Sequence, residues 1–346
     1  MNDIVSKQRT FFYTHKTKAI QFRLAQLNKL GTLLKSNEDL LYQAIYKDFK
    51  KSKFDTYVTE LALLYQDLKE AKKNIHKWSR TKRVGTNMLN FPASSYIIPE
   101  PLGVCLVIGA WNYPTQIACW KAAPALACGN TMVFKPSETT PVCALKIAEI
   151  LSLAGLPDGV FNVIQGQGDV GASLVGDERV AKVSLTGSVP TGRKVYAAAA
   201  ADVKHVTMEL GGKSPNVFFE DVMKSDDAFF DKCLEGFTMF ALNQGEVCTC
   251  PSRALIQESI YDDFMARAIE RTKAVKQGNP LQMDTMIGAQ VSIEQMEKIT
   301  SYLKLGRDEG AEVLVGGDVG SVEGCENGNY IQPTIFKGDN SMRVFQ

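Results

Sequence analysis

The sequence predicts an α/β fold in which a doubly wound parallel sheet is followed by a second α/β domain. The chain has 346 residues, which is more than one hydrophobic core usually organises. Between about residues 100 and 210, apolar stretches of strand length alternate with helical stretches. This alternation is typical of a parallel sheet with helices on both faces. We therefore expect two domains, residues 1–210 and residues 211–346.

The first part of the chain, residues 4–80, is predicted to be helical. Apolar residues recur at three- and four-residue steps, as at Leu24, Leu27 and Leu30, which is the spacing of one helix face. These helices are expected to pack on the sheet and to carry no catalytic residue. The next segment, residues 80–99, contains several basic residues and is expected to be an irregular, solvated surface turn.

Five apolar stretches are expected to form the strands of a Rossmann-like sheet. They are residues 103–108, 131–134, 160–164, 181–185 and 205–208. Because such a sheet binds ligands at the carboxyl ends of its strands, the residues that follow these stretches are the first candidates for a functional site. These candidates are Trp111 and Asn112, then Lys135, Ser137 and Glu138, then Gly168, then Thr186, Gly187, Ser188 and Gly192, and finally Glu209, Leu210 and Gly211.

The stretch from Gly166 to Gly171 spells the glycine fingerprint of dinucleotide-binding proteins. It follows the third expected strand, not the first, and no acidic residue lies at a strand end ~20 residues further on, where that motif has one. We therefore favour a tight turn with close packing for this stretch, while Gly168 stays among the cofactor candidates.

Two other strand ends suit the parts of a dinucleotide better. A helix begins within residues 187–192, and the free N–H groups of its first turn would attract a phosphate, to which Ser188 adds a hydroxyl. Lys135 and Glu138 could each form hydrogen bonds with the hydroxyls of a ribose. The plainer alternative is that Ser137 only caps a helix that has acids in its first turn.

The second domain carries Cys248 just after a glycine turn, at the end of an apolar helical run over residues 226–242. A thiol here and the carboxylate of Glu209, each beside a Gly-rich turn, indicate covalent catalysis with a separate base. Cys250 is the rival thiol, since a Cys-x-Cys pair could bind a metal or act in redox chemistry. No other ligands lie nearby in sequence, so we expect Cys250 to be a packed neighbour. The other elements expected in this domain are strands at 216–219, 254–257, 313–315 and 330–336 and helices at 260–276 and 293–306.

The composition argues against several functional classes. The formal net charge is +1, so no bulk charge favours nucleic acid or a membrane surface. Eight cysteines are scattered through the chain, and the three histidines are far apart. This favours reduced thiols in the cytoplasm and no metal site. The start of the chain lacks the apolar stretch of a signal peptide, and no run approaches the ~18 apolar residues of a membrane span.

Several motifs, taken together and in order, give the chain a resemblance to a known family. The motifs are Trp111-Asn-Tyr-Pro114, Lys135-Pro-Ser-Glu138, Thr186-Gly-Ser188 with Gly192, Glu209-Leu-Gly-Gly-Lys-Ser-Pro215, and Asn243-Gln-Gly-Glu-Val-Cys248 with Arg253. From about Val5 to its end the chain resembles the NAD(P)-dependent aldehyde dehydrogenases. The resemblance implies a NAD(P)-binding domain up to residue 210 and a catalytic domain after it. It also implies that Cys248 is the nucleophile, Glu209 the general base and Asn112 the oxyanion donor, and that the other strand-end candidates hold the cofactor.

The three parts of the chain resemble different branches of this family. The N-terminal third is similar to class-3-like enzymes, the middle to betaine-aldehyde dehydrogenases, and the C-terminal third to bacterial acetaldehyde dehydrogenases. We therefore expect a composite sequence. The family pattern continues beyond residue 346, so we also expect a catalytic domain that is truncated at its C-terminus, with reduced activity and impaired assembly into the homodimer or tetramer that the family implies.

The activity that the resemblance implies is oxidation of an aldehyde to a carboxylic acid through a thiohemiacetal and a thioester on Cys248. NAD is the expected cofactor because Glu138 should repel a 2′-phosphate, whereas NADP stays possible because Lys135 could meet that phosphate. The main alternative is an inactive fragment that only binds nucleotide. Two others are an acylating enzyme that uses coenzyme A, against which Glu209 argues, and a structural protein, against which the intact Cys248 and Glu209 argue.

Overall fold

The structure is a computed structural model that describes residues 2–153 and 155–346. Met1 and Ala154 lie outside the described residues. Met1 is the first residue of the segment for which the sequence predicts no signal peptide. The chain divides into two compact units, unit 1 (Met1–Leu210) and unit 2 (Gly211–Gln346). Each unit is described by itself.

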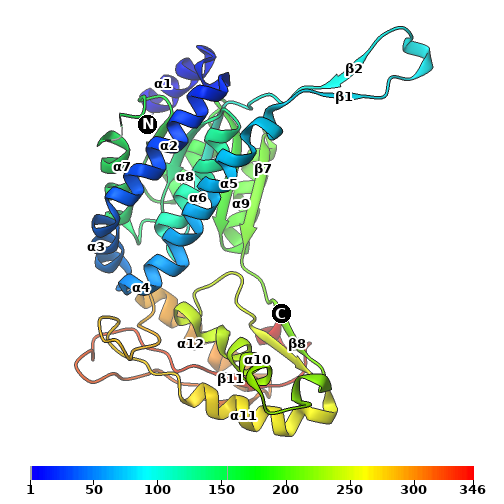
Figure 1. Cartoon of the computed structure of the whole chain (residues 1–346). Coiled ribbons are helices and arrows are strands. Elements are labelled where there is room, and N and C mark those ends of the chain that lie inside the picture. Colours follow the sequence, from blue (N-terminus) through cyan, green and yellow to red (C-terminus); the bar gives the residue numbers. More distant parts are fainter. Residues whose placement is uncertain (1, 154) are drawn as a thin grey trace. The chain divides into compact units, whose positions relative to one another are not determined.

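A five-stranded parallel sheet forms the centre of unit 1, as the sequence predicts (Figure 1). Its strands are β3 (Val104–Ile108), β4 (Thr131–Lys135), β5 (Phe161–Val163), β6 (Val180–Gly187) and β7 (His205–Leu210). They lie in the order β5-β4-β3-β6-β7, and every neighbouring pair is parallel. The chain winds outward from β3 in one direction and then from β6 in the other, so β3 and β6 flank the switch point at which doubly wound sheets bind ligands.

Helices cover both faces of this sheet. They are α1 (Asn2–Tyr13), α2 (Ile20–Ser36), α3 (Glu38–Phe49), α4 (Lys53–Thr56), α5 (Ala62–Ser79), α6 (Pro114–Ala127), α7 (Pro141–Leu153), α8 (Gly168–Val175) and α9 (Val189–Ala200), with a π-helical turn, η2 (Tyr57–Leu61), between α4 and α5. Successive strand residues point to opposite faces. Val107 therefore packs with α2, α5, α6 and α7, whereas Leu106 packs with α1, α8 and α9.

The segment 80–99 differs from the prediction of an irregular turn. Strands β1 (Lys82–Val84) and β2 (Ser95–Ile97) pair antiparallel and form a ribbon that projects from unit 1 (Figure 1). The strands are short, and no two-residue Asn-Gly or Asp-Gly turn connects them, so the sequence lacks the usual hairpin signal. The loop between the strands exposes apolar side chains that are 92%, 95% and 84% accessible, those of Met88, Leu89 and Phe91 respectively.

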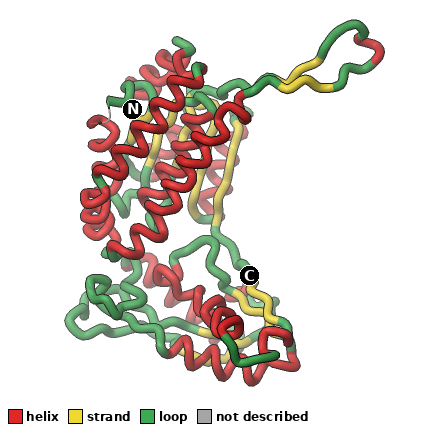
Figure 2. The backbone as a smooth tube through the Cα atoms, in the orientation of Figure 1, coloured by secondary structure: helices red, strands yellow, loops and turns green. Residues whose placement is uncertain are grey.

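Unit 2 combines three longer helices with two small sheets (Figure 2). The elements are β8 (Pro215–Phe218) paired with β9 (Arg253–Ile256), β10 (Glu312–Val315) paired with β11 (Ile335–Lys337), α10 (Ala228–Thr238), α11 (Tyr261–Lys273) and α12 (Ile293–Asp308). Aromatic packing forms its core, with the ring centroids of Phe218 and Phe264 4.6 Å apart. The strand expected at 330–336 covers only Ile335–Lys337.

The helix expected over residues 226–242 is also shorter than predicted. It ends at Thr238 and continues as a 3₁₀ segment, η5 (Met239–Gly245). Within η5 the backbone leaves helical geometry at Leu242 and adopts left-handed conformations at Asn243 and Gln244. The apolar periodicity of the sequence gives no indication of this change in backbone conformation.

Candidate active site

The carboxyl ends of β3 and β4 lie level with each other, and the neighbouring strand β6 continues to Gly187. Ile108, the last residue of β3, is in register with Lys135 on one side and with Leu185 on the other. Trp111 and Asn112 follow β3 directly and precede α6. The topology of unit 1 therefore gathers the predicted strand-end residues at one edge of the sheet.

Lys135 is the last residue of β4, and its side chain is only 5% exposed. Its Nζ donates a hydrogen bond to Oε2 of the exposed Glu138 at 3.2 Å. Ser137 does not cap a helix, because α7 begins at Pro141 and the Ser137 hydroxyl instead accepts the backbone N–H of Thr139. The plain capping explanation for this motif is therefore excluded.

The Gly166–Gly171 stretch forms a close turn that leads into α8. Gly166 has a φ of +154°, and a Cβ there would lie 2.4 Å from a methyl group of Val170. Gly168 is the first residue of α8, and no heavy atom comes within 4 Å of a Cβ built on it. The turn is thus tightly packed at its first glycine, as the sequence predicts, and open at Gly168.

The segment after β6 begins α9 within residues 187–192, as the sequence predicts. Ser188 is the N-cap, and its hydroxyl accepts the backbone N–H of Thr191 at 3.3 Å. The helix therefore starts at Val189. A Cβ at Gly192 would lie 2.7 Å from Cδ2 of Leu210, so the absence of a side chain at Gly192 lets α9 approach the end of β7.

Glu209 lies inside β7, not after it as predicted. The ladder with β6 continues through the pairs Thr186–Glu209 and Gly187–Leu210, which lengthens both strands. The Glu209 side chain is exposed. It interacts electrostatically with Lys121 of α6: burial lowers the pKa of Lys121, and the negative charge of Glu209 raises it and offsets part of that shift.

Lys121 is not among the residues predicted from the sequence. The sequence does carry a signal, because Lys121 is the one charged residue in the mostly apolar sequence of α6. A lysine on a largely buried helix needs an interaction that favours its charged form. The carboxylate of Glu209 provides one.

In unit 2, Cys248 lies just beyond a turn of left-handed residues. Asn243, Gln244 and Gly245 have φ values of 50°, 58° and 79°, a conformation that costs free energy at the two residues other than glycine. Hydrogen bonds hold the turn in place. The side chain of Gln290 donates to the Gln244 carbonyl oxygen at 3.0 Å.

The loop that follows this turn buries one side chain and exposes the thiol. Glu246 is 6% exposed, and its carboxylate accepts the backbone N–H of Val291 at 3.2 Å. Cys248, two residues later, is exposed. The loop is therefore anchored next to the predicted nucleophile, while the thiol itself stays accessible.

Cys250 differs from Cys248 in its surroundings. Its side chain is buried, and its Sγ donates a hydrogen bond to the Met239 carbonyl oxygen at 2.9 Å. Burial, and to a smaller extent the charge of Cys248, raises the pKa of Cys250 to about 11. This thiol stays protonated near neutral pH and is a poor nucleophile, in keeping with the expected role of a packed neighbour. All eight cysteines are free thiols.

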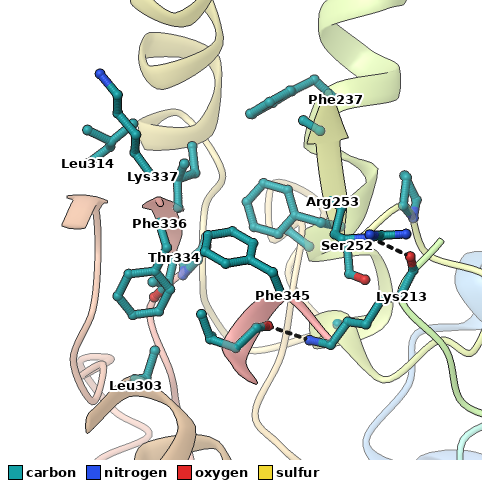
Figure 3. A pocket seen from close by; sticks show the side chains of 18 of the residues that line it. Lys213, Phe237, Ser252, Arg253, Leu303, Leu314, Thr334, Phe336, Lys337 and Phe345 are labelled. Atoms are coloured by element: carbon teal, nitrogen blue, oxygen red, sulfur yellow. Dashed lines mark hydrogen bonds between the residues drawn. The ribbon is translucent and has the colours of Figure 1, made fainter. Parts of the chain in front are cut away.

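Unit 2 also contains a cavity of about 580 Å³ (Figure 3). Aromatic side chains, among them Phe237 and Phe345, line it together with Lys213 and Arg253. Lys213 Nζ donates to the Val344 carbonyl oxygen at 3.1 Å, and Arg253 Nε donates to the Lys213 carbonyl oxygen at 2.9 Å. Cys248 is not among the lining residues, so this cavity does not identify the site of thiol chemistry.

The described residues contain neither a candidate metal site nor a candidate membrane span. In residues 2–153 and 155–346, no group of three or more His, Cys, Asp or Glu side chains could hold a metal ion. Within the same residues no helix is long and apolar enough to cross a membrane.

Comparisons with known proteins agree with one another. The model of the aldehyde dehydrogenase family matches residues 1–346. The chain is 49% identical over 322 residues to acetaldehyde dehydrogenase 2 of Cupriavidus necator, which covers 92% of this chain and 63% of that protein. It is 54% identical over 268 residues to an aldehyde dehydrogenase of Deinococcus radiodurans, covering 77% of this chain and 52% of that protein.

Solved structures give the same result. A betaine aldehyde dehydrogenase mutant of Staphylococcus aureus in complex with NAD+ has a TM-score of 0.91 and 32% identity, covering 99% of this chain and 68% of that one. The aldehyde dehydrogenase KauB of Pseudomonas aeruginosa has a TM-score of 0.91 and 33% identity, covering 100% and 69%. The chain thus spans between about half and two thirds of the length of the curated relatives it matches. One relative aligns across most of the chain, and the composite origin stays a prediction.

Proposed function

The chain belongs to the aldehyde dehydrogenase family, and from this premise we propose that it oxidises an aldehyde to a carboxylic acid with NAD+. The observation that carries the proposal is the accessible thiol of Cys248 beside an anchored turn. The other thiol of this loop, Cys250, is buried and protonated. A nucleophilic cysteine needs this combination of access and a fixed backbone.

The edge of the sheet in unit 1 suits a dinucleotide. The order in which the chain adds strands reverses between β3 and β6, and doubly wound sheets bind such ligands at this point. Lys135 and Glu138 would hold the ribose, and the start of α9 at Ser188 would face the phosphates. The space at Gly168 leaves room for backbone contact. Trp111, Ser137, Thr186, Gly187, Gly192, Leu210 and Gly211 complete the proposed set.

The cofactor preference follows from the exposed carboxylate of Glu138. A carboxylate accepts hydrogen bonds from a 2′-hydroxyl and repels a 2′-phosphate, so we infer a preference for NAD over NADP. Solved relatives have been crystallised with NAD+, which supports the same choice. Lys135 forms a hydrogen bond with Glu138, and this pairing limits how well the ammonium could meet a phosphate.

The proposed chemistry uses three side chains. The Cys248 thiolate attacks the aldehyde carbonyl carbon and forms a thiohemiacetal, and the side-chain amide of Asn112 donates a hydrogen bond to the developing oxyanion. One such donor is typically worth about 2.7–4 kcal/mol. NAD+, held by the residues of unit 1, would supply the two-electron oxidant that this chain lacks, so that the thiohemiacetal on Cys248 can become a thioester. Glu209 then takes a proton from water, and the resulting hydroxide releases the acid and restores the thiolate.

Unit 1 would then be the cofactor-binding domain with its helical N-terminal region, and unit 2 the catalytic domain. We also infer a homodimer or tetramer. The exposed apolar side chains of Met88, Leu89 and Phe91 on the projecting ribbon are unusual for a monomer surface, and a second copy would cover them. Sedimentation velocity tests this inference, because a triple replacement by serine should shift the protein toward monomer. The free thiols suit a reducing cytoplasm, and neither nucleic acid nor a membrane is a proposed partner.

The substrate is an aldehyde whose class the relatives only suggest. Their names include acetaldehyde, long-chain aldehyde and betaine aldehyde dehydrogenases. An assay of NADH formation with these three aldehydes in parallel would rank them. Cys248→Ala should abolish aldehyde-dependent NADH formation, while Cys250→Ala should retain most of it. If the two variants behave in the reverse way, our assignment of the nucleophile is wrong. Thermal stabilisation by NAD+ without turnover would instead support an inactive nucleotide-binding fragment.

A further inference from the structure

Unit 1 contains an ion pair that is buried on both sides. Lys51 Nζ lies 3.0 Å from Glu60 Oε1, and the two side chains are 2% and 0% exposed. Fourteen other ion pairs among the described residues each have at least one side chain that is more than a tenth exposed. Desolvation of two charges opposes folding, so such a pair is a poor way to stabilise a fold. Its hydrogen bonds indicate another role.

The lysine holds the backbone of the segment that carries Asn112. Lys51 Nζ donates to the Asn112 carbonyl oxygen at 3.1 Å. The same ammonium lies 4.5 Å from the centroid of the Tyr113 ring, within the range of a cation–π contact. The Asn112 side chain leaves the backbone directly before this carbonyl group. Fixing the peptide plane therefore restricts the direction of the side-chain amide.

The glutamate holds the other side of the same segment. Glu60 Oε2 accepts the backbone N–H groups of Thr115 and Gln116, at 2.9 and 3.2 Å. These are the first free donors of α6, since Pro114 has none and the N-cap residue Tyr113 makes no side-chain cap. A carboxylate is favourable at this end of a helix dipole. Glu60 therefore caps α6 from a different element of the fold.

The local backbone around Glu60 is also irregular. Glu60 belongs to the π-helical turn η2 (Tyr57–Leu61) that interrupts the helix formed by α4 and α5. π-helical turns are uncommon and are found frequently at functional sites. Here the irregular turn carries the side chain that reaches α6.

We propose that Lys51 and Glu60 are positioning residues that fix the orientation of Asn112. The pair does so through hydrogen bonds to the Asn112 carbonyl group and to the first N–H groups of α6. This inference rests on the proposed function, in which the Asn112 amide stabilises the oxyanion. Neither residue touches the substrate in this proposal. Their effect is transmitted through the Asn112 carbonyl group and the start of α6.

The experiment compares Lys51→Met with a matched control, Lys204→Met. Lys204 is also buried, and its Nζ donates to backbone carbonyl groups of Val175 and Asp177, but it lies just before the start of β7, away from the carboxyl edge of the sheet. Lys51→Met should lower kcat about ten- to a hundredfold, short of the roughly 10²–10³-fold loss typical for removal of an oxyanion donor, with the KM for NAD+ unchanged. Lys204→Met should leave kcat within about twofold, since removing a buried charge away from the reacting groups affects stability and not the transition state.

Two further variants separate positioning from stability. In an Asn112→Ala background, Lys51→Met should have little additional effect on kcat, because the group it orients is gone. The double variant Lys51→Met/Glu60→Gln leaves no unpaired buried charge, so it should recover thermal stability without recovering kcat. Additive losses in kcat, or recovery of kcat together with stability, would refute the positioning role.

A second measurement tests the orientation of Asn112 without relying on enzyme activity. In protein labelled with ¹⁵N-asparagine, the side-chain amide of Asn112 should give one sharp pair of NMR signals in the unaltered chain and in Lys204→Met, and broadened or split signals in Lys51→Met. Unchanged signals in Lys51→Met would contradict the inference. If the unaltered chain oxidises no aldehyde, the proposed function fails by itself, and this measurement still decides the orientation of Asn112.

Discussion

The contact between Gly192 and Leu210 yields a prediction that links packing to cofactor binding. A methyl group at position 192 would lie 2.7 Å from one methyl group of Leu210 and 3.0 Å from the other. The side chain of Leu210 must therefore rotate away in Gly192→Ala. Because Leu210 is a proposed cofactor contact at the end of β7, we expect weaker binding of NAD+.

The expected magnitude follows from two opposing effects. Alanine is favoured over glycine in the interior of a helix such as α9 by roughly 1 kcal/mol, whereas overpacking typically costs about 1–3 kcal/mol, so the net loss of stability should be at most about 2 kcal/mol. Full burial of a leucine side chain is worth about 1.5–3 kcal/mol. Leu210 is half-buried, so the displaced contact should weaken NAD+ binding by about 1 kcal/mol, or roughly fivefold.

A fluorescence titration with NAD+ measures this change directly. The matched control is Leu210→Ala alone and in combination with Gly192→Ala. Each single variant should bind NAD+ several times more weakly, and the double variant should bind about as weakly as Leu210→Ala, because no leucine remains to be displaced. If Gly192→Ala binds NAD+ as tightly as the unaltered chain, Leu210 is not a cofactor contact.

Three other predictions concern single side chains. Cys250→Ala should retain aldehyde oxidation and should lose less stability at alkaline pH than the unaltered chain does. The reason is that the pKa of Cys250 is raised to about 11, so the stability that the protonated thiol contributes is present below about pH 8.5 and is lost as the pH rises toward 11. Thermal melts of both proteins across this pH range measure the difference. Glu246→Ala should lower kcat by loosening the loop anchored to the Val291 N–H, whereas Glu246→Gln, which keeps an acceptor oxygen, should be milder; equal losses would exclude the anchoring role. Glu138→Gln should lower the KM for NADP more than that for NAD, because it removes repulsion of the 2′-phosphate, and steady-state kinetics with both cofactors would reveal any opposite trend.

The centre of the sheet could be predicted from the sequence because β3 and β4 are short apolar runs buried on both faces. Val104–Ile108 and Thr131–Lys135 lie almost where the apolar stretches do. The ends of the last two strands could not be predicted, since Glu209 is drawn into β7 by its pairing with Thr186. Local polarity at Glu209 indicates a loop, and the ladder between neighbouring strands overrides it.

The residues around the candidate site were harder to find than the site itself. Cys248 and Glu209 stand beside glycine-rich turns that are visible in the sequence. Glu60, in contrast, appears as one more polar position on an amphipathic helix. Its partners, the N–H groups of Thr115 and Gln116, are more than fifty residues away in the chain, and no local pattern connects them. Supporting contacts of this kind are set by the tertiary fold.

The covalent role of Cys248 is tested most directly by trapping its thioester. In Glu209→Gln the proposed base is missing, so the acyl group should accumulate on the cysteine when the protein is mixed with NAD+ and an aldehyde. Mass spectrometry of the peptides should find one acyl group, located on Cys248, and none in the absence of NAD+. An acyl group on Cys250, or steady formation of NADH by this variant with no acylated peptide, would contradict the proposed mechanism.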